Sequence, residues 1–249
     1  MATDPGVASV HSWDLSTGVD GPGTRFVLFL SGCPLRCLYC QNPDTWQMRD
    51  GTRMTLAEVL DEVQGYRRFL QVAHGGVTAS GGEPLLQSQF VAAFFAAGKE
   101  WGLTTALDTS GYLGRRADEA LLDATDLVLL DIKSFEPQTY RRVTTEEVGP
   151  TLDFARRLAD LGKPMWIRFV LVPGLSDDPA NVRGLADFVA SLGPAVERVE
   201  VLPFHRLGAP KYEALRRPFP LANTPTPTRA EVAAVADTLR RRDLPVFVA

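Results

Sequence analysis

Short apolar runs recur along the chain, and segments with a helical pattern of apolar residues separate them. Apolar runs of four to eight residues bounded by polar or glycine-rich residues are typical of buried strands. The pattern predicts six strands, at residues 24–31, 76–80, 104–108, 126–131, 165–172 and 196–203. Strands that alternate with helices in this way indicate βα units around a parallel sheet.

The segments between the strands carry apolar residues at helical spacing. The pattern predicts helices over residues 55–70, 87–101, 115–124, 151–161, 179–192 and 229–241. One face of the first helix holds Leu56, Val59, Leu60, Val63, Tyr66 and Leu70. Two helices begin with a capping-box spacing, Thr55 with Glu58 and Thr228 with Glu231, and Gly102 marks the expected end of the second helix.

Polar or glycine-rich residues follow the carboxyl end of every predicted strand. In a parallel barrel these ends meet on one face, whereas an open doubly wound sheet would normally use only its switch point. We therefore expect an α/β fold, a partial (β/α)6 TIM-like barrel with a lateral gap for a large substrate. Residues 1–249 are expected to form one domain, with an N-terminal extension and DGPG loop at 1–23, a core at 24–205, and a C-terminal loop, helix and strand at 206–249.

Composition and charge narrow the classes of protein. The net charge is −4, with 45% hydrophobic and 22% charged residues, which is ordinary for a chain that buries a core. No basic run indicates nucleic-acid binding. The N-terminus lacks the features of a signal peptide, and no apolar run is long enough to span a membrane. We expect a cytoplasmic, monomeric protein that binds neither nucleic acid nor membranes.

All three cysteines of the chain lie within eight residues, Cys33, Cys37 and Cys40. In a reducing compartment, clustered cysteines are metal ligands or catalysts more often than disulfides. A structural zinc site needs four ligands, and one of the histidines, His11, His74 or His205, would have to complete it. A [4Fe–4S] cluster takes one thiolate per iron, so three cysteines leave one iron open for chemistry. Three inert buried cysteines are the remaining alternative.

Two further motifs follow predicted strands. Gly81 and Gly82, in "SGGEP", permit either close approach of the backbone to a ligand or a tight turn. Asp131 and Lys133, in "DIK", lie on the same side of an extended segment because side chains alternate there. They form either a surface ion pair or part of a site, where the lysine would suit a carboxylate.

The remaining candidates are single residues. Arg168, midway along the fifth strand, either reaches the surface or lines a site. The stretch "DTSG" (108–111) and the "DGPG" that begins at Asp20 are rich in turn-forming residues.

Several motifs together resemble a known family. The cysteine spacing, with Tyr39 before the last cysteine, resembles the signature of radical S-adenosylmethionine (SAM) enzymes. The longer stretch "VDGPGTRFVLFLSGCPLRCLYCQNPDTW" (19–46) is similar to activating proteins of glycyl radical enzymes. The segments "GGVTASGGEPLLQ", "LDTSGY", "DLVLLDIK", "WIRFVLVPG" and "VLPFHRLG" resemble the members that activate pyruvate formate-lyase. The resemblance extends over nearly the whole chain after about residue 8.

The resemblance implies a cofactor set and a reaction. Cys33, Cys37 and Cys40 would hold a [4Fe–4S] cluster whose open iron is chelated by SAM. Under anaerobic conditions, an electron from the cluster would cleave SAM to methionine and a 5′-deoxyadenosyl radical. That radical would take a hydrogen from a backbone glycine of pyruvate formate-lyase. Flavodoxin or ferredoxin would supply the electron.

The resemblance also assigns individual residues. Around SAM it places Tyr39, Gln41, Gly81, Gly82, Glu83, Asp131, Ile132, Lys133, Arg168 and His205, with Lys133 and His205 among the catalytic residues. A monovalent cation would lie among Asp108, Thr109, Leu129 and Asp131, and Asp20 would lie near the substrate loop. Two positions depart from the family pattern: Pro84 replaces a common alanine, and Gln41 replaces histidine, so backbone contacts are expected there.

Other functions stay open at this level. Activases of several other glycyl radical enzymes carry an inserted ferredoxin-like domain with many more cysteines than this chain has. Activases of ribonucleotide reductase are usually shorter than this chain. Both facts favour the type that activates pyruvate formate-lyase. A radical SAM enzyme that acts on a small molecule or on another glycyl radical enzyme is a second enzymatic alternative. A non-enzymatic electron carrier or a metal-stapled binding module is a third, and it leaves the polar strand ends unexplained.

Overall fold

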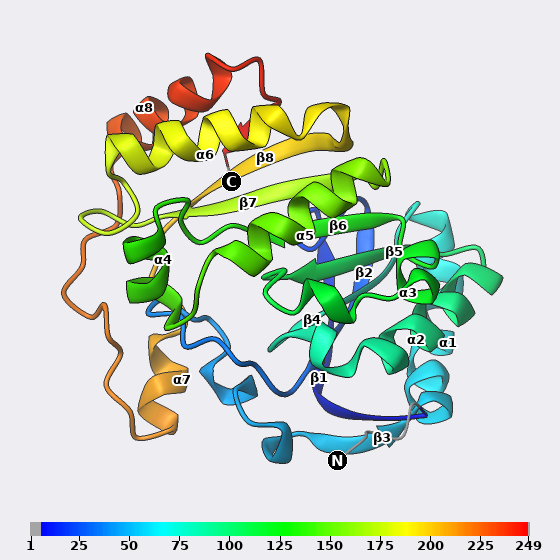
Figure 1. Ribbon diagram of the computed structural model, residues 1–249. Coiled ribbons are helices and arrows are strands. Elements are labelled where there is room, and N and C mark those ends of the chain that lie inside the picture. The colour runs from blue at the N-terminus through cyan, green and yellow to red at the C-terminus, as the bar shows by residue number, and fades with distance from the viewer. Residues whose placement is uncertain (1–5, 249) are drawn as a thin grey trace. The chain divides into compact units, whose positions relative to one another are not determined.

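The computed structural model describes residues 6–248 (Figure 1). Contacts between residues divide the chain into two compact units. The first unit holds Met1–Pro34, Asp44–Thr109 and Leu113–Leu129, and the second holds Leu35–Pro43, Ser110–Tyr112 and Leu130–Ala249. Residues 1–5 and 249, part of the predicted terminal segments, lie outside the described residues. The prediction of a single domain stays a prediction.

The first unit is built on five strands. They are β1 (Val7–Thr17), β2 (Thr24–Leu30), β3 (Thr52–Thr55), β4 (Gly76–Gly81) and β5 (Thr104–Thr109), in the order β3-β1-β2-β4-β5. The pairs β2–β4 and β4–β5 are parallel, whereas β1 is antiparallel to both β2 and β3. The helices are α1 (Leu56–Val72), α2 (Ser88–Glu100) and α3 (Glu119–Asp123), with 3-10 turns at Met48–Asp50, Pro84–Gln87 and Gly114–Arg116.

Helix α1 confirms its predicted start but buries a narrower face than expected. The Thr55 side chain accepts a hydrogen bond from the Glu58 amide, and the Glu58 carboxylate accepts one from the Thr55 amide, which is the predicted capping box. Of the predicted apolar face, only Val59, Val63 and Leu70 are buried. Tyr66 is 38% exposed, and its ring lies 6.0 Å from the Phe26 ring of β2.

The second unit contains three parallel strands in the order β7-β8-β9. They are β7 (Met165–Leu171), β8 (Val196–Pro203) and β9 (Val246–Val248). The helices are α4 (Pro137–Thr144), α5 (Gly149–Asp160), α6 (Pro179–Ser191), α7 (Ala209–Ala214) and α8 (Arg229–Arg240), with a 3-10 turn at Gly193–Ala195. Strand β6 (Leu127–Asp131) and the 3-10 turn at Pro43–Thr45 each have residues in both units.

Strand alternation sets the core of the second unit. Ile167 and Phe169 of β7 and Val199 and Val201 of β8 face the same side and are fully buried. Helices α6 and α8 lie together along β8 (Figure 1). The neighbouring positions on each strand point to the opposite side of the sheet, since side chains alternate with period two.

The structure confirms the six predicted strands to within one residue at each end, and it adds elements that the pattern did not predict. The additional elements are β1, β3, α4 and α7. Both helices are short and begin with proline in the first turn, so tertiary contacts stabilise them more than sequence periodicity does. Among residues 6–248, no helix is long and apolar enough to cross a bilayer.

Candidate functional site

In the first unit, the glycine loop after β4 packs directly on the backbone that leads to Cys33. The Gly82 amide donates to Leu30 O at 2.8 Å, and the Glu83 amide donates to Gly32 O at 2.8 Å. Gly81 has φ of +108°, and a Cβ at Gly82 would lie 2.3 Å from Gly32 O. Both glycines are therefore required by close packing against the start of the cysteine segment.

Two carboxylates of the first unit are held by neighbouring hydroxyl groups. Glu83 is buried, and its Oε1 accepts from the Leu85 amide at 3.1 Å and from Thr109 Oγ1 at 2.6 Å. Asp108 Oδ2 accepts from Ser80 Oγ at 2.6 Å. The predicted cation ligands Asp108 and Thr109 are thus joined by hydrogen bonds to the residues on either side of the glycine loop, Ser80 and Glu83. Leu129 is a buried core residue.

The DGPG stretch forms the predicted turn. Gly21 and Gly23 have φ of +122° and +69°, a region that favours glycine. The carbonyl of Asp20 accepts from Thr78 Oγ1 at 2.8 Å, which ties the turn to β4. The turn begins β2 and so lies at the amino end of that strand.

In the second unit, the segment with Cys37 and Cys40 is fixed by the end of α4. The Arg36 amide donates to Thr144 O at 2.8 Å, and the Leu38 amide donates to Val143 O at 2.9 Å. The Cys40 amide closes a turn on Cys37 O at 3.1 Å. Helix α4 was not predicted from the sequence, and it supplies the acceptors that hold this segment.

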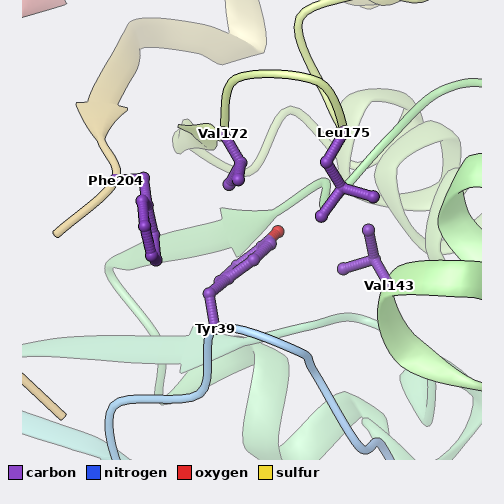
Figure 2. Close-up of a cluster of buried hydrophobic side chains, with 5 residues drawn as sticks. All are labelled: Tyr39, Val143, Val172, Leu175 and Phe204. Carbon is purple, nitrogen blue, oxygen red and sulfur yellow. The ribbon is translucent and has the colours of Figure 1, made fainter. Parts of the chain in front are cut away.

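The side chain of Tyr39 is buried in an apolar cluster of the second unit. Its ring points into the space bounded by Val143, Val172, Leu175 and Phe204 (Figure 2). Tyr39 is 4% exposed, and its hydroxyl has no hydrogen-bond partner among the described residues. The ring therefore anchors the cysteine segment to the unit.

Two residues that sequence reasoning missed also hold this segment. Gly208 lies so close that an added Cβ would be 3.0 Å from Cys40 O and 3.1 Å from Gln41 Cα. Lys211 Nζ of α7 donates to Asn42 Oδ1 at 2.8 Å. A glycine followed closely by proline is a local signal for such a turn and helix start.

Asp131, Lys133 and Arg168 form a partly buried charge cluster in the second unit. Lys133 Nζ lies 2.5 Å from Asp131 Oδ2, and Arg168 Nε lies 3.7 Å from Asp131 Oδ1. Their side chains are 13–17% exposed, so this is no surface ion pair. Lys133 Nζ is also 5.9 Å from the centre of the Tyr39 ring.

The electrostatics of this cluster keep both partners of the Lys133–Asp131 pair charged. Burial alone would raise the pKa of Asp131, but Lys133 and Arg168 outweigh it and lower that pKa. Burial alone would lower the pKa of Lys133, but Asp131 outweighs it and raises that pKa. The cluster thus presents a fixed ammonium, a group suited to a ligand carboxylate.

The three thiols are half-buried, and none forms a disulfide. Burial raises the pKa of the Cys37 thiol to about 12, and the charge of Lys133 opposes that rise. Within residues 6–248, no three His, Cys, Asp or Glu side chains are grouped around a common metal position. His11 pairs with Asp44, its Nε2 lying 3.0 Å from Oδ2.

The other predicted site residues lie in the second unit. His205 is exposed, and its Nδ1 accepts from the Leu207 amide at 3.4 Å. The side chain of Ile132 is fully buried, and its amide donates to Arg168 O at 3.0 Å. Gln41 Nε2 donates to Tyr39 O at 3.3 Å, so this side chain braces its own loop.

Comparison with known proteins defines the class. The family model of the radical SAM superfamily matches residues 27–185. A radical SAM methyltransferase from Sphaerobacter thermophilus is similar in fold, with a TM-score of 0.66 at 19% identity, over 94% of this chain and 68% of that one. The chain belongs to the radical SAM superfamily and has its type of mixed α/β fold with a mostly parallel sheet, as the sequence predicted.

Closer relatives define the family within that class. The pyruvate formate-lyase-activating enzyme of Listeria monocytogenes serovar 1/2a is 42% identical over 236 residues, 92% of this chain and 94% of the relative. The pyruvate formate-lyase 1-activating enzyme of Escherichia coli K12 is 40% identical over 238 residues, 94% of this chain and 96% of the relative. Within the superfamily, the chain belongs to the pyruvate formate-lyase-activating enzymes.

Proposed function

We propose that the protein activates pyruvate formate-lyase by forming a radical on a backbone glycine of that enzyme. The observation that carries this proposal is the similarity to two such activases across more than nine-tenths of the chain. The cysteine spacing required for a radical SAM cluster is present, and the chain has no cysteines beyond it. Both features favour the activase with a single cluster.

The residues present fit a [4Fe–4S] cluster. Thiolates are the usual ligands of such clusters, and Cys33, Cys37 and Cys40 are held in no disulfide. The Cys37–Cys40 turn is fixed by backbone hydrogen bonds to α4 and by close contact with Gly208. When bound, the cluster supplies one electron to SAM, whose cleavage to methionine gives the 5′-deoxyadenosyl radical that removes the glycine hydrogen.

The charge cluster supports a role in holding SAM. Lys133 offers an ammonium to the methionyl carboxylate, while Asp131 and Arg168 fix its position and charge. The apolar cluster around Tyr39 excludes water from the side of the turn that it covers. The family resemblance assigns His205, which is exposed, as a second SAM-binding residue beside Lys133.

The proposal includes finer assignments from the family resemblance. Flavodoxin or ferredoxin is the electron donor, the enzyme acts as a cytoplasmic monomer, and a monovalent cation is bound by Asp108, Thr109, Leu129 and Asp131. Carboxylate, hydroxyl and carbonyl oxygens are suitable ligands for such a hard cation. Tyr39, Gln41, Gly81, Gly82, Glu83 and Ile132 complete the residues assigned to SAM.

The decisive experiment is radical formation in the partner. Reduced, cluster-loaded protein is mixed with SAM and pyruvate formate-lyase without oxygen, and the electron paramagnetic resonance spectrum is recorded. We expect a doublet-split glycyl signal that disappears when the target glycine of the partner is replaced by alanine. SAM cleavage without this signal, for this and other glycyl radical enzymes, would reassign the protein to a small-molecule substrate.

A second test addresses SAM binding. Lys133→Ala should weaken SAM affinity by roughly tenfold to a hundredfold, because a hydrogen bond to a charged group contributes about 1.5–3 kcal/mol. Iron and sulfide content should not change. The matched control is Lys99→Ala, which breaks a partly exposed ion pair with Asp126 in the first unit. Equal SAM affinity in Lys133→Ala and wild type, measured by titration calorimetry, would remove Lys133 from the SAM site.

A further inference from the structure

One face of the β7-β8-β9 sheet carries charged side chains among apolar ones, whereas β7 and β8 bury apolar residues on the other face. The register pairs Trp166 with Arg198, Arg168 with Glu200, and Glu200 with Phe247. Paired residues of parallel strands share a face, so these five side chains project from the same side of the sheet. The opposite side carries Ile167, Phe169, Val199 and Val201, all with no exposed surface. Two arginines and a glutamate are unusual on a sheet face that serves only for apolar packing, so this face is a candidate for ligand binding.

Arg198 is held in one position on this face. Its guanidinium lies 3.8 Å from the centre of the Trp166 ring and 5.1 Å from that of Phe247. Its Nη1 donates to Glu200 Oε1 at 3.3 Å. The Arg198 side chain is nevertheless 34% exposed, whereas that of Glu200 is 5% exposed. A guanidinium fixed in this way loses little further conformational entropy when it binds a ligand.

The bonding capacity of Arg198 is mostly unused. An arginine has five N–H donors, and only the bond to Glu200 is formed by Arg198 within residues 6–248. A guanidinium has no acceptor, so its ligand must present oxygen atoms. Burial raises the pKa of Glu200, and the charges of Arg168 and Arg198 oppose that rise. The two arginines therefore favour the ionised form of the Glu200 side chain.

The same face connects Arg198 with the charge cluster of the candidate site. Arg168 stands opposite Glu200 in the register and lies 3.7 Å from Asp131. On the other side, β9 is the last strand of the described sheet, and Phe247 on it is 47% exposed. Extended peptides bind along exposed sheet edges, with side-chain contacts adding specificity. Since the proposed substrate is a protein, a polypeptide segment that crosses this face is the ligand that would present oxygen atoms to Arg198.

We propose that Arg198 is a substrate-binding residue whose guanidinium donates a hydrogen bond to an oxygen atom of an extended segment of the protein substrate. Contacts with Trp166, Phe247 and Glu200 hold the guanidinium in position. The inference rests on the proposed function, because it assumes a protein substrate. The oxygen belongs either to a backbone carbonyl or to an acidic side chain of that segment. Glu200 is a positioning residue, since it acts through Arg198.

The test compares steady-state activation of the partner by cluster-loaded variants. Arg198→Met keeps the aliphatic contact with Trp166 but removes every donor, and it should raise KM for pyruvate formate-lyase about tenfold. The value of kcat and the affinity for SAM should change less than threefold. Arg198→Lys keeps the positive charge but not the planar guanidinium with its several N–H donors, and it should raise KM less than Arg198→Met does. The control is Arg183→Met on α6, an exposed arginine away from this face.

Glu200→Gln tests the positioning role and should raise KM by a smaller factor than Arg198→Met does. Glu197→Gln, at an exposed residue of the same strand, is its control.

Ionic strength distinguishes the two oxygen sources. The contribution of Arg198 to affinity should fall with ionic strength if its partner is a carboxylate and stay nearly constant if its partner is a backbone carbonyl. An unchanged KM in Arg198→Met would overturn the inference while wild-type activation still supports the proposed function. Absence of a glycyl radical with the wild-type protein would overturn the proposed function instead.

Discussion

At the scale of single residues, Tyr39 shows how the cysteine segment is anchored. Its ring is surrounded by Val143, Val172, Leu175 and Phe204, but its hydroxyl is buried without a hydrogen bond among the described residues. An unsatisfied buried hydroxyl costs stability, whereas the ring contributes through apolar contact. The aromatic ring, rather than the hydroxyl group, is the feature that this position requires.

Tyr39→Phe is therefore expected to raise the free energy of unfolding of the cluster-free protein by about 1 kcal/mol. The measurement is urea denaturation followed by circular dichroism. Tyr66→Phe, at a ring that is 38% exposed, is the control and should have little effect. A loss of stability in Tyr39→Phe would mean that the hydroxyl is satisfied in solution.

Glu200 gives a second expectation at this scale, through pH. Burial raises its pKa in the folded protein above the unfolded value, so the folded state binds its proton more tightly. The contribution of Glu200 to stability is thus largest below the unfolded pKa and falls as pH rises through the folded pKa.

Glu200→Gln removes this titration and should gain stability relative to wild type as pH rises from about 4 to about 7. Thermal melting across that pH range measures the difference. Glu197→Gln, where the carboxylate is exposed, should show no such trend. A relative loss of stability in Glu200→Gln with rising pH would contradict a raised pKa.

At the scale of elements, short turns do more to shape the site than the long helices do. The loop after β4 packs on the backbone between Leu30 and Gly32, and the turn at Cys37–Cys40 is held by the end of α4. At Gly82, and at Gly208 beside Cys40, main-chain atoms approach so closely that a side chain has little room. A glycine substitution there acts on the position of a loop, not on helix or strand propensity.

Gly82→Ala would place a Cβ 2.3 Å from Gly32 O and 3.1 Å from Thr45 O. Since both atoms are backbone, the loop must move, and we expect a loss of about 1–3 kcal/mol in stability and weaker SAM binding. Calorimetric melting and SAM titration test both effects. Gly65→Ala on α1 is the control, because a Cβ added there would meet no atom within 4 Å apart from the backbone of its own helix. This substitution should stabilise the helix by about 0.5–1 kcal/mol. Equal melting temperatures for Gly82→Ala and wild type would contradict this prediction, because they would mean that the loop moves to admit the Cβ without a loss of stability.

At the scale of the whole molecule, the proposed chemistry depends on the three cysteines acting as cluster ligands. Cys33 belongs to the first compact unit, and Cys37 and Cys40 belong to the second. A group that binds only the folded chain stabilises it by mass action. Cluster loading should therefore raise the melting temperature of the wild-type protein as well as enable catalysis.

Each single Cys→Ala variant should lose both the iron signal and the rise in melting temperature on reconstitution, because the chain has no fourth cysteine to substitute. Iron and sulfide analysis beside anaerobic calorimetry provides the measurement. The cluster-free variants should melt close to the cluster-free wild type, which separates ligand loss from misfolding. Retention of iron, sulfide and activity in a triple variant would refute the assignment.

Local sequence alone predicted six of the strands and the two capped helices, and the cysteine spacing together with the longer motifs indicated the family and so its chemistry. Periodicity and capping boxes act within about ten residues, so β2, α1 and α8 begin where the pattern predicts. The three cysteines proposed as ligands are neighbours in the chain, so their spacing can be recognised without a fold. The pair Asp131 and Lys133 was likewise predictable, because residues two apart on an extended segment share a side.

Only the tertiary structure decided which distant residues support that chemistry. Tyr39 meets Val143, Val172 and Phe204 more than a hundred positions away, and Arg198 lies between Trp166 and Phe247. Helices α4 and α7 are too short to be stable alone, so packing creates them, and with them the acceptors and the lysine that hold the cysteine turn. Such contacts depend on strand register and on packing between segments distant in the chain, and no local pattern of apolar and polar residues encodes them.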